Sequence, residues 1–114
     1  MKTPAMRGPL KVSDVVEGGV CPGMIGGGSR VSGRGLAKGS LGESGCGLWI
    51  CTPCRWESHL TNDEFSHFPA GRCTCIHDSG DAIEITPGTA AFLSENRSGV
   101  CKVHATITKA YMIR

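Results

Sequence analysis

Short apolar segments separated by turn residues run through the second half of the chain. From Leu48 onward they read LWICT, RWESHL, EFSHF, RCTCIHD, AIEI, AAFL and VCKVHATITKAYMI. None of them carries the apolar residues at every third or fourth position that mark an amphipathic helix. The last segment alternates a core-facing set with a solvent-facing set, as a half-buried strand does. The first set is Cys101, Val103, Ala105 and Ile107, and the second is Lys102, His104, Thr106 and Thr108. We therefore predict an all-β chain of short strands.

The residues between these segments are typical of tight turns. HDSGDA lies between two strand-like runs and predicts a hairpin, and TPGT then opens the next strand. Residues 1–46 differ, because the glycine-rich stretch 21–45 holds few apolar residues. We expect residues 1–46 to be an N-terminal arm or loop with one short strand or turn in KVSDVVEGGV. Residues 47–114 are expected to be the folded core of a single domain.

Length and charge exclude several classes of protein. The 114 residues are enough for one domain and too few for two. The net charge of +2 is too small for a general polyanion-binding surface, so we expect no nucleic-acid partner. No stretch reaches the ~18 apolar residues of a membrane helix, and MKTPAMRGPLKV lacks the apolar core of a signal peptide. We expect a cytoplasmic protein without a membrane partner.

The landmarks of the second half are spaced as in a known family. In order along the chain they are Trp49, TP at 52–53, Trp56, DEF at 63–65, Gly71, Gly80, PG at 87–88, Lys109, Tyr111 and Ile113. This pattern resembles the cupin family that contains (S)-ureidoglycine aminohydrolase and the ethanolamine-utilisation cupin. The resemblance implies a double-stranded β-helix, the jelly-roll barrel, whose walls enclose a small-molecule pocket. It also implies a homodimer.

The metal motif of that family is only partly present. Metal-binding cupins present His-x-His-x4-Glu and a later histidine, all aimed into the barrel, whereas this chain reads Glu57-x-His59-x4-Glu64. Residues two apart on a strand share a face, so the altered motif still offers a chelating set. The position of the later histidine falls near Gly99. The resemblance therefore implies either no cofactor or one divalent metal ion held by Glu57, His59 and Glu64. The alternative for His59 and Glu64 is a hydrogen-bonded pair in a polar barrel interior.

The same resemblance supplies the other candidate site residues. His59 and Glu64 are the candidates for moving a proton, and Tyr111 is either a pocket acid or a structural hydrogen-bonding group. The residues expected to form the pocket or the adjoining core are Glu57, Trp49, Trp56, Phe65, Phe68 and Phe92. A mostly apolar pocket with a few polar groups is the usual form of a small-molecule site.

The seven cysteines admit more than one interpretation. An odd number without an export signal favours reduced thiols over a disulfide framework. Cys51-x-x-Cys54 with Cys73-x-Cys75 resembles paired zinc knuckles, but the second pair has one residue between its thiols instead of two. The simpler interpretation is that most of them fill the core as small apolar residues, with Cys54 exposed at a turn. Redox catalysis is not expected, because no helix follows Cys54 to lower its pKa.

Three functions remain open at this point. The first is a cupin that acts on a small metabolite by isomerisation, dehydration, cyclisation or hydrolysis, with the barrel excluding water. The second is a non-catalytic, dimeric cupin that binds a metabolite. The third is a small β domain stabilised by zinc. Whether the chain is an enzyme is left open, because fold alone does not choose a reaction.

Overall fold

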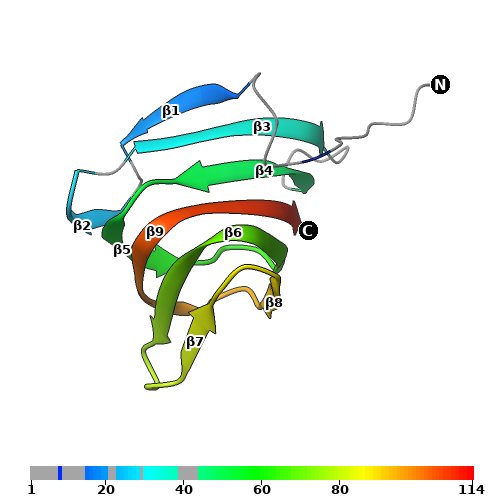
Figure 1. Cartoon of the computed structure of the whole chain (residues 1–114). Coiled ribbons are helices and arrows are strands. Elements are labelled where there is room, and N and C mark those ends of the chain that lie inside the picture. The colour runs from blue at the N-terminus through cyan, green and yellow to red at the C-terminus, as the bar shows by residue number, and fades with distance from the viewer. Residues whose placement is uncertain (1–7, 9–14, 21–22, 29, 39–43) are drawn as a thin grey trace.

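The structure is a computed structural model, and it describes residues 8, 15–20, 23–28, 30–38 and 44–114. Within these residues the chain forms strands and no helix, which confirms the all-β prediction (Figure 1). The strands are β1 (Val16–Val20), β2 (Met24–Gly26), β3 (Arg30–Lys38), β4 (Gly45–Cys51), β5 (Cys54–His59), β6 (Glu64–His77), β7 (Ala82–Ile85), β8 (Thr89–Leu93) and β9 (Ser98–Ile113). The described part of the chain accordingly holds no helix that is long and apolar enough to span a membrane.

The two longest strands, β6 and β9, pair with each other and connect two halves of the fold. In one half, the C-terminal part of β9 pairs with β4, and the N-terminal part of β6 pairs with β8. In the other half, the N-terminal part of β9 pairs with β5, and the C-terminal part of β6 pairs with β7. Figure 1 shows β6 and β9 curving together, so that the sheet curls around an interior.

The bend lies where the β6–β9 register shifts, between His67 and Cys73. Gly71 sits within it with φ of 95°, a left-handed conformation that residues with a side chain rarely adopt. A β-carbon at this position would collide with the backbone of Thr106 and Ile107 on β9. Glycine is therefore required here for both conformation and space, and the close approach of the two strands depends on it.

The glycine-rich segment is not a loop throughout. Residues 16–38 contain β1, β2 and β3, and β3 pairs with β4 along most of its length. The expectation of a loop is wrong there, because glycines on β3 and β4 permit close backbone contact: a side chain at Gly33 or Gly47 would press on the opposite strand. The boundary expected between residues 46 and 47 falls inside β4. The remainder of the predicted arm, at 1–7 and 9–14, lies outside the described residues.

The core lies between the two halves and is rich in cysteine. Its buried members are Val31, Cys51, Cys54, Phe68, Cys73, Cys75, Ile85, Cys101, Val103 and Ile107. Cys54 is thus buried, contrary to the expectation of an exposed turn residue. Phe65 and Phe92 are 51% and 57% exposed, so placing them in the core or pocket was wrong. They lie opposite each other on β6 and β8, with side chains on the outer face of the sheet.

The alternation predicted for the last segment holds only in part. Cys101, Val103 and Ile107 are buried as expected, but Ala105 is exposed and Thr108 is buried. Both departures lie beside the bend, where β9 passes from its pairing with β5 to its pairing with β4. A strand that curves between two halves presents different surroundings to residues of the same face.

One pair of cysteines is oxidised. Cys75 on β6 and Cys101 on β9 are directly opposite in register, with their Cα atoms 4.1 Å apart, and they form a disulfide. The expectation that every thiol is reduced is wrong for this pair. Because Cys75 is bonded to Cys101, it is not available as a zinc ligand with Cys73.

We predict that Gly71→Ala destabilises the fold more than Gly80→Ala. Both glycines have φ of 95°, so each alanine pays a left-handed backbone cost of roughly 1–2 kcal/mol. Only Gly71 is also packed against another strand, whereas the space beside Gly80 is open. Urea unfolding followed by circular dichroism should show a loss at Gly71 of about 3 kcal/mol or more. Equal losses at both positions would show that the bend tolerates a side chain.

Candidate functional site

A cavity of about 200 Å³ lies between the two halves of the fold. It is lined by Trp49, Trp56, Ser58, Leu60, Glu64, Phe68, Cys73, Cys75, Ile85, Leu93, Cys101, Ile107 and Lys109. Most of the wall is aromatic or aliphatic, and Trp49 and Trp56 meet edge to face with ring centroids 5.9 Å apart. The cavity therefore has the composition of a small-molecule site, with its charged groups confined to one region.

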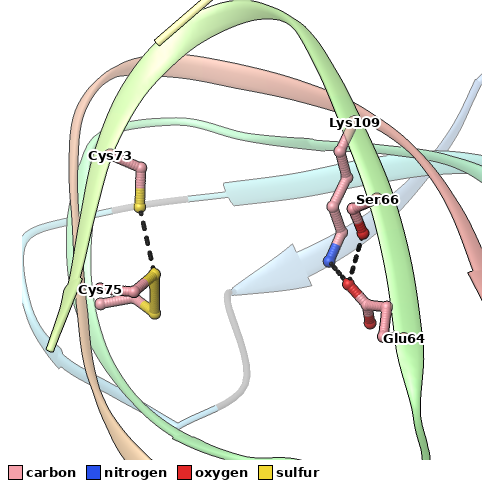
Figure 2. A network of polar contacts seen from close by, with 6 residues as sticks. Glu64, Ser66, Cys73, Cys75 and Lys109 are labelled. Carbon is pink, nitrogen blue, oxygen red and sulfur yellow. Dashed lines mark hydrogen bonds and ion pairs between the residues drawn. A yellow bond between two sulfur atoms is a disulfide. The ribbon is translucent and has the colours of Figure 1, made fainter. Parts of the chain in front are cut away.

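That charged region is an ion pair between β6 and β9. Lys109 Nζ donates to Glu64 Oε2 at 2.6 Å, and Ser66 Oγ donates to the same oxygen at 2.8 Å (Figure 2). The side chains of Glu64 and Lys109 are only 10% and 17% exposed. No hydrogen bond from another described residue reaches Glu64 Oε1, which leaves that oxygen's lone pairs available on the cavity side.

Strand alternation and register bring these groups together. Glu64, Ser66 and Phe68 occupy alternate positions of β6, and all three are buried. Lys109 lies opposite Trp49 in the β4–β9 register, and its ammonium sits 4.8 Å from the centre of a Trp49 ring. This contact is a cation–π interaction, which holds the ammonium beside the apolar wall.

An isolated ion pair in such surroundings is costly to build. Removing two charges from water carries a desolvation penalty that their attraction only partly repays, and apolar residues of similar size are often as stable. The pair is therefore poorly explained as a device for stability alone. Buried, interacting ionisable groups beside a cavity are typical of sites that bind or convert a ligand.

Tyr111 occupies a second hollow next to the first. This hollow, of about 230 Å³, is lined by Trp49, Glu64, Lys109, Tyr111 and Ile113. Burial raises the pKa of Tyr111 above 10.0, and the negative charge of Glu64 and the nearby Cys46 raise it further. The phenol thus keeps its proton at neutral pH and can act as a hydrogen-bond donor. Glu64 and Lys109 stand at the boundary between the two hollows.

The predicted metal set is not assembled. Glu64 lines the cavity, but Glu57 and His59 are exposed on the outer face of β5, and His59 Nδ1 is 2.6 Å from Ser98 Oγ. Among the described residues, no group of three or more His, Cys, Asp and Glu side chains is placed to hold a metal ion. These residues do not fit a cupin metal, and the expectation that they converge on one ion is corrected here.

The physical reason is a shift of one residue in the inward face of β5. Trp56, Ser58 and Leu60 line the cavity, so the residues between them must point outward. The sequence RWESHL already carries this signal, because its charged or ionisable residues alternate with less polar ones. Assigning both Trp56 and Glu57 to the pocket was inconsistent, since neighbours on a strand face opposite ways.

The other predicted site residues lie at or near the cavity. Trp49, Trp56 and Phe68 line it, and Tyr111 lines the adjoining hollow. The sequence analysis missed Lys109 and Ser66 as site residues. Lys109 was one of the landmarks of the family resemblance, and it lies two residues before Tyr111 on the same strand face, which was the available signal. Ser66 follows Glu64 by the same spacing.

The far end of the cavity is made of sulfur. Cys73 Sγ lies 3.7 Å from Cys75 Sγ, which belongs to the Cys75–Cys101 disulfide (Figure 2). Burial raises the pKa of the Cys73 thiol to about 12, and the neighbouring Cys51 and Cys54 add to the effect. The nucleophilic thiolate is therefore scarce at neutral pH, and Cys73 acts as an apolar wall residue.

Comparisons with known proteins support this description of the fold. A family model described as the EutQ-like cupin domain matches residues 38–111. A protein of unknown function from Pseudomonas syringae pv. tomato str. DC3000, a member of the DUF861 family, superposes with a TM-score of 0.80 and 14% identity over 90% of this chain. This chain spans 45% of that protein's length. No curated protein matches the sequence.

Two further solved structures share the architecture. The EutQ protein of Clostridium difficile has a TM-score of 0.63 and 18% identity, covering 75% of this chain and 68% of its own. A cupin superfamily protein from Desulfitobacterium hafniense DCB-2 has a TM-score of 0.61 and 12% identity, covering 73% of this chain and 75% of its own. At these identities the likeness shows the fold alone, and the fold it shows is the predicted jelly-roll barrel.

We predict strong coupling between Glu64 and Lys109 in a double-mutant cycle. Lys109→Met leaves a buried carboxylate without its partner and should cost about 3 kcal/mol or more, whereas Lys109→Met with Glu64→Met should cost less than either single change. Urea unfolding followed by tryptophan fluorescence measures both. The matched control is Arg114→Met, which removes an ion pair with Asp63 at the surface and should cost below ~1 kcal/mol. Additive losses in the cycle would contradict a functional unit.

We also predict that Cys73 weakens the fold at high pH. The unfolded thiol has its ordinary pKa of 9.0, whereas the folded one titrates near 12. Between these values the unfolded chain has released a proton that the folded chain retains, so the free energy of unfolding falls as pH rises, by up to about 1.4 kcal/mol per pH unit. Below pH 9 the contribution is intact. Urea midpoints should fall less steeply above pH 9 in Cys73→Val, and an unchanged slope would rule out this thiol as the cause.

Proposed function

The chain belongs to the EutQ-like cupin domain family, and we propose that it binds a small metabolite in its barrel cavity and moves a proton on that metabolite. The observation that carries the proposal is the Glu64–Lys109 pair, nearly buried yet lining an otherwise apolar cavity. The family resemblance noted for the ethanolamine-utilisation cupin is consistent with a single-domain protein of this kind. The reaction itself is argued from the side chains, because members of one fold differ in chemistry.

The cavity limits the size and character of the ligand. Its volume of about 200 Å³ corresponds to roughly seven water molecules at liquid density, so a compact metabolite fits and a nucleotide does not. Trp49, Trp56 and Phe68 would contact the apolar part of the ligand. A polar group would be directed to Glu64 and Lys109, where both an acceptor and a donor are present.

Each polar residue has a role that follows from its contacts. Glu64 Oε1 is the proton acceptor, because Oε2 is already held by Lys109 and Ser66. Lys109 keeps the carboxylate oriented, and its remaining N–H bonds stabilise negative charge that develops on the ligand. Tyr111 donates a hydrogen bond from the adjoining hollow, since its proton is retained. The apolar walls exclude water from the transfer.

These roles suit a carbon acid next to a carbonyl or carboxyl group. Removal of a proton by Glu64 would leave an enolate-like anion, and Lys109 is the cation beside it. Return of the proton at another position gives isomerisation, and loss of a neighbouring hydroxyl group gives dehydration. Both belong to the classes expected from the sequence, and neither step is routed through a metal ion.

The second candidate is a cupin that binds a metabolite without converting it. The observation that favours it is that the outward orientation of Glu57 and His59 removes the metal ligands on which many cupins rely. In this case the Glu64–Lys109 pair would orient the ligand and serve for recognition only. The two candidates predict the same binding site and differ in whether protons exchange.

A deuterium-exchange experiment tests the proposal. We expect small keto acids, hydroxy acids and amino alcohols, screened by ligand-observed NMR in D2O, to include a binder whose carbon-bound hydrogen exchanges in the presence of the protein. Glu64→Gln should slow that exchange by about 10²-fold or more, because a general base contributes 10²–10⁴-fold. His59→Ala is the control and should leave both binding and exchange unchanged, because His59 lies outside the cavity.

The outcomes separate the two candidates. Binding that is lost in Lys109→Met, without exchange in the native protein, would support the non-catalytic cupin. Exchange that survives Glu64→Gln but not His59→Ala would contradict the assignment of the site to the barrel interior.

A further inference from the structure

The outer face of the β5–β9–β6 surface carries a second hollow, unrelated to the barrel cavity. Its volume is about 420 Å³, and its lining residues are Arg55, Thr74, Ile76, His77, Asp78, Val100, Lys102 and His104. None of the residues that line the barrel cavity contributes to it. The two spaces use opposite faces of the same strands, because residues alternate between inside and outside.

A row of directly opposed side chains crosses the bottom of this hollow. Arg55 on β5 pairs with Lys102 on β9, Lys102 pairs with Thr74 on β6, and Thr74 pairs with Glu84 on β7. Like charges directly opposite each other on neighbouring strands are unfavourable. The pairing of Arg55 with Lys102 is therefore a local cost to the fold, and both side chains are exposed.

Neither cation of this pair is neutralised within the described part of the chain. The ion pairs found there involve other basic residues, namely Arg30, Arg97, Lys109 and Arg114. The carboxylate of Glu84, two strands away from Lys102, is engaged by Thr74 Oγ1 at 3.0 and 3.2 Å. Asp78 lines the hollow as well, but without an ion pair to Arg55 or Lys102. The positive charge of Arg55 and Lys102 is thus left to solvent or to a ligand.

His104 is held in place beside these cations. Thr74 Oγ1 donates its proton to Glu84, so the same oxygen accepts the proton of His104 Nε2 at 2.8 Å. This arrangement fixes the position of the imidazole and assigns its tautomer from the hydrogen-bond network. The chain Glu84–Thr74–His104 stabilises the imidazolium form whenever a negative group enters the hollow. His104 is then the third cation facing one space.

Apolar groups form the rest of the surface. Ile76 on β6 and Val100 on β9 are directly opposite each other, and Ile76 is half exposed. They lie next to the Arg55–Lys102 row, one alternate position further along the strands. A ligand with an anionic end and a small apolar body would therefore meet complementary surface along its length.

From these observations we propose that the outer hollow is a binding site for a small phosphorylated metabolite, with Arg55, Lys102 and His104 around its phosphate group. A dianion matches two permanent cations and one inducible cation better than a single carboxylate does. Arginine also binds phosphate oxygens through two parallel N–H bonds, which gives geometry as well as charge. The site is distinct from the barrel cavity, so two ligands can be bound at once.

The experiment is a titration of the whole chain with inorganic phosphate and with phenyl phosphate, followed by amide NMR shifts at constant ionic strength. We expect saturable shifts on β5, β6 and β9 around Arg55 and Thr74, with a Kd at or below about 1 mM. Phenyl phosphate should bind more tightly than inorganic phosphate, because its ring reaches Ile76 and Val100. Equal affinities would overturn the assignment of an organic phosphate.

Matched variants separate a built site from general charge attraction. Arg55→Gln should weaken phosphate binding by about tenfold or more, as expected for a lost charged hydrogen bond. Lys38→Gln removes the same charge from an exposed position on β3 and should leave the affinity unchanged. Equal weakening by both variants would overturn the proposal, because it would show non-specific attraction.

Two further readouts keep the test decisive. Arg55→Gln also relieves the like-charge pair, so its urea midpoint without phosphate should be unchanged or higher, which excludes misfolding as the cause of lost binding. Shifts confined to residues that line the barrel cavity would overturn the outer site while leaving the proposed function untouched. Binding only to phosphatidylcholine vesicles that contain phosphatidic acid, without response to soluble phosphates, would overturn the assignment to a small metabolite.

Discussion

Strands β6 and β9 remain hydrogen-bonded to each other while both bend sharply, and the rest of the fold depends on that shared bend. Each strand contributes one part to each half of the barrel, so the interior exists only because the pair turns at the same level. The turn requires Gly71, which combines a left-handed backbone with close contact to β9. Once the bend is made, β4, β5, β7 and β8 have only one edge each on which to pair.

The bend also explains the composition of the interior. The cavity has a polar end, where Glu64 near the start of β6 meets Lys109 near the end of β9, and a sulfur end, where Cys75 and Cys101 join the same two strands. A disulfide between paired strands and an ion pair between paired strands both resist separation of β6 from β9. They differ in meaning, because the disulfide closes a wall whereas the ion pair places charge next to apolar space at an energetic cost.

Both proposed sites arise from a single property of strands. Successive side chains point to opposite faces, so β5, β6 and β9 present one set of residues to the cavity and another to the outer hollow. The inner set is aromatic and apolar with a paired acid and base, which suits a compact, nearly neutral ligand. The outer set contains Arg55 opposite Lys102, which suits an anion. Separate chemistry on the two faces thus requires no additional domain.

The sequence by itself determined the class of fold and the apolar part of the site. Short alternating runs and turn residues indicated strands, and the spacing of landmarks such as Trp49 and Tyr111 indicated the family, because local propensity and spacing are properties of the chain alone. The glycine-rich strand β3 was not predictable from these signals, since its glycines serve contacts with β4 that exist only after pairing. The exposure of Phe65 was missed for a similar reason: an apolar residue on a strand does not reveal which face is covered.

The tertiary structure alone decided which charged groups meet. Glu57 and His59 have the spacing of ligands, yet one residue of register turns them outward, and β-strand register is set by partners distant in sequence. Conversely, Glu64 and Lys109 are 45 residues apart and form the centre of the site. Such a contact cannot be read from spacing, because it depends on how two strands bend and align. The sequence supplied the residues, and the curvature of β6 against β9 determined which of them share a cavity.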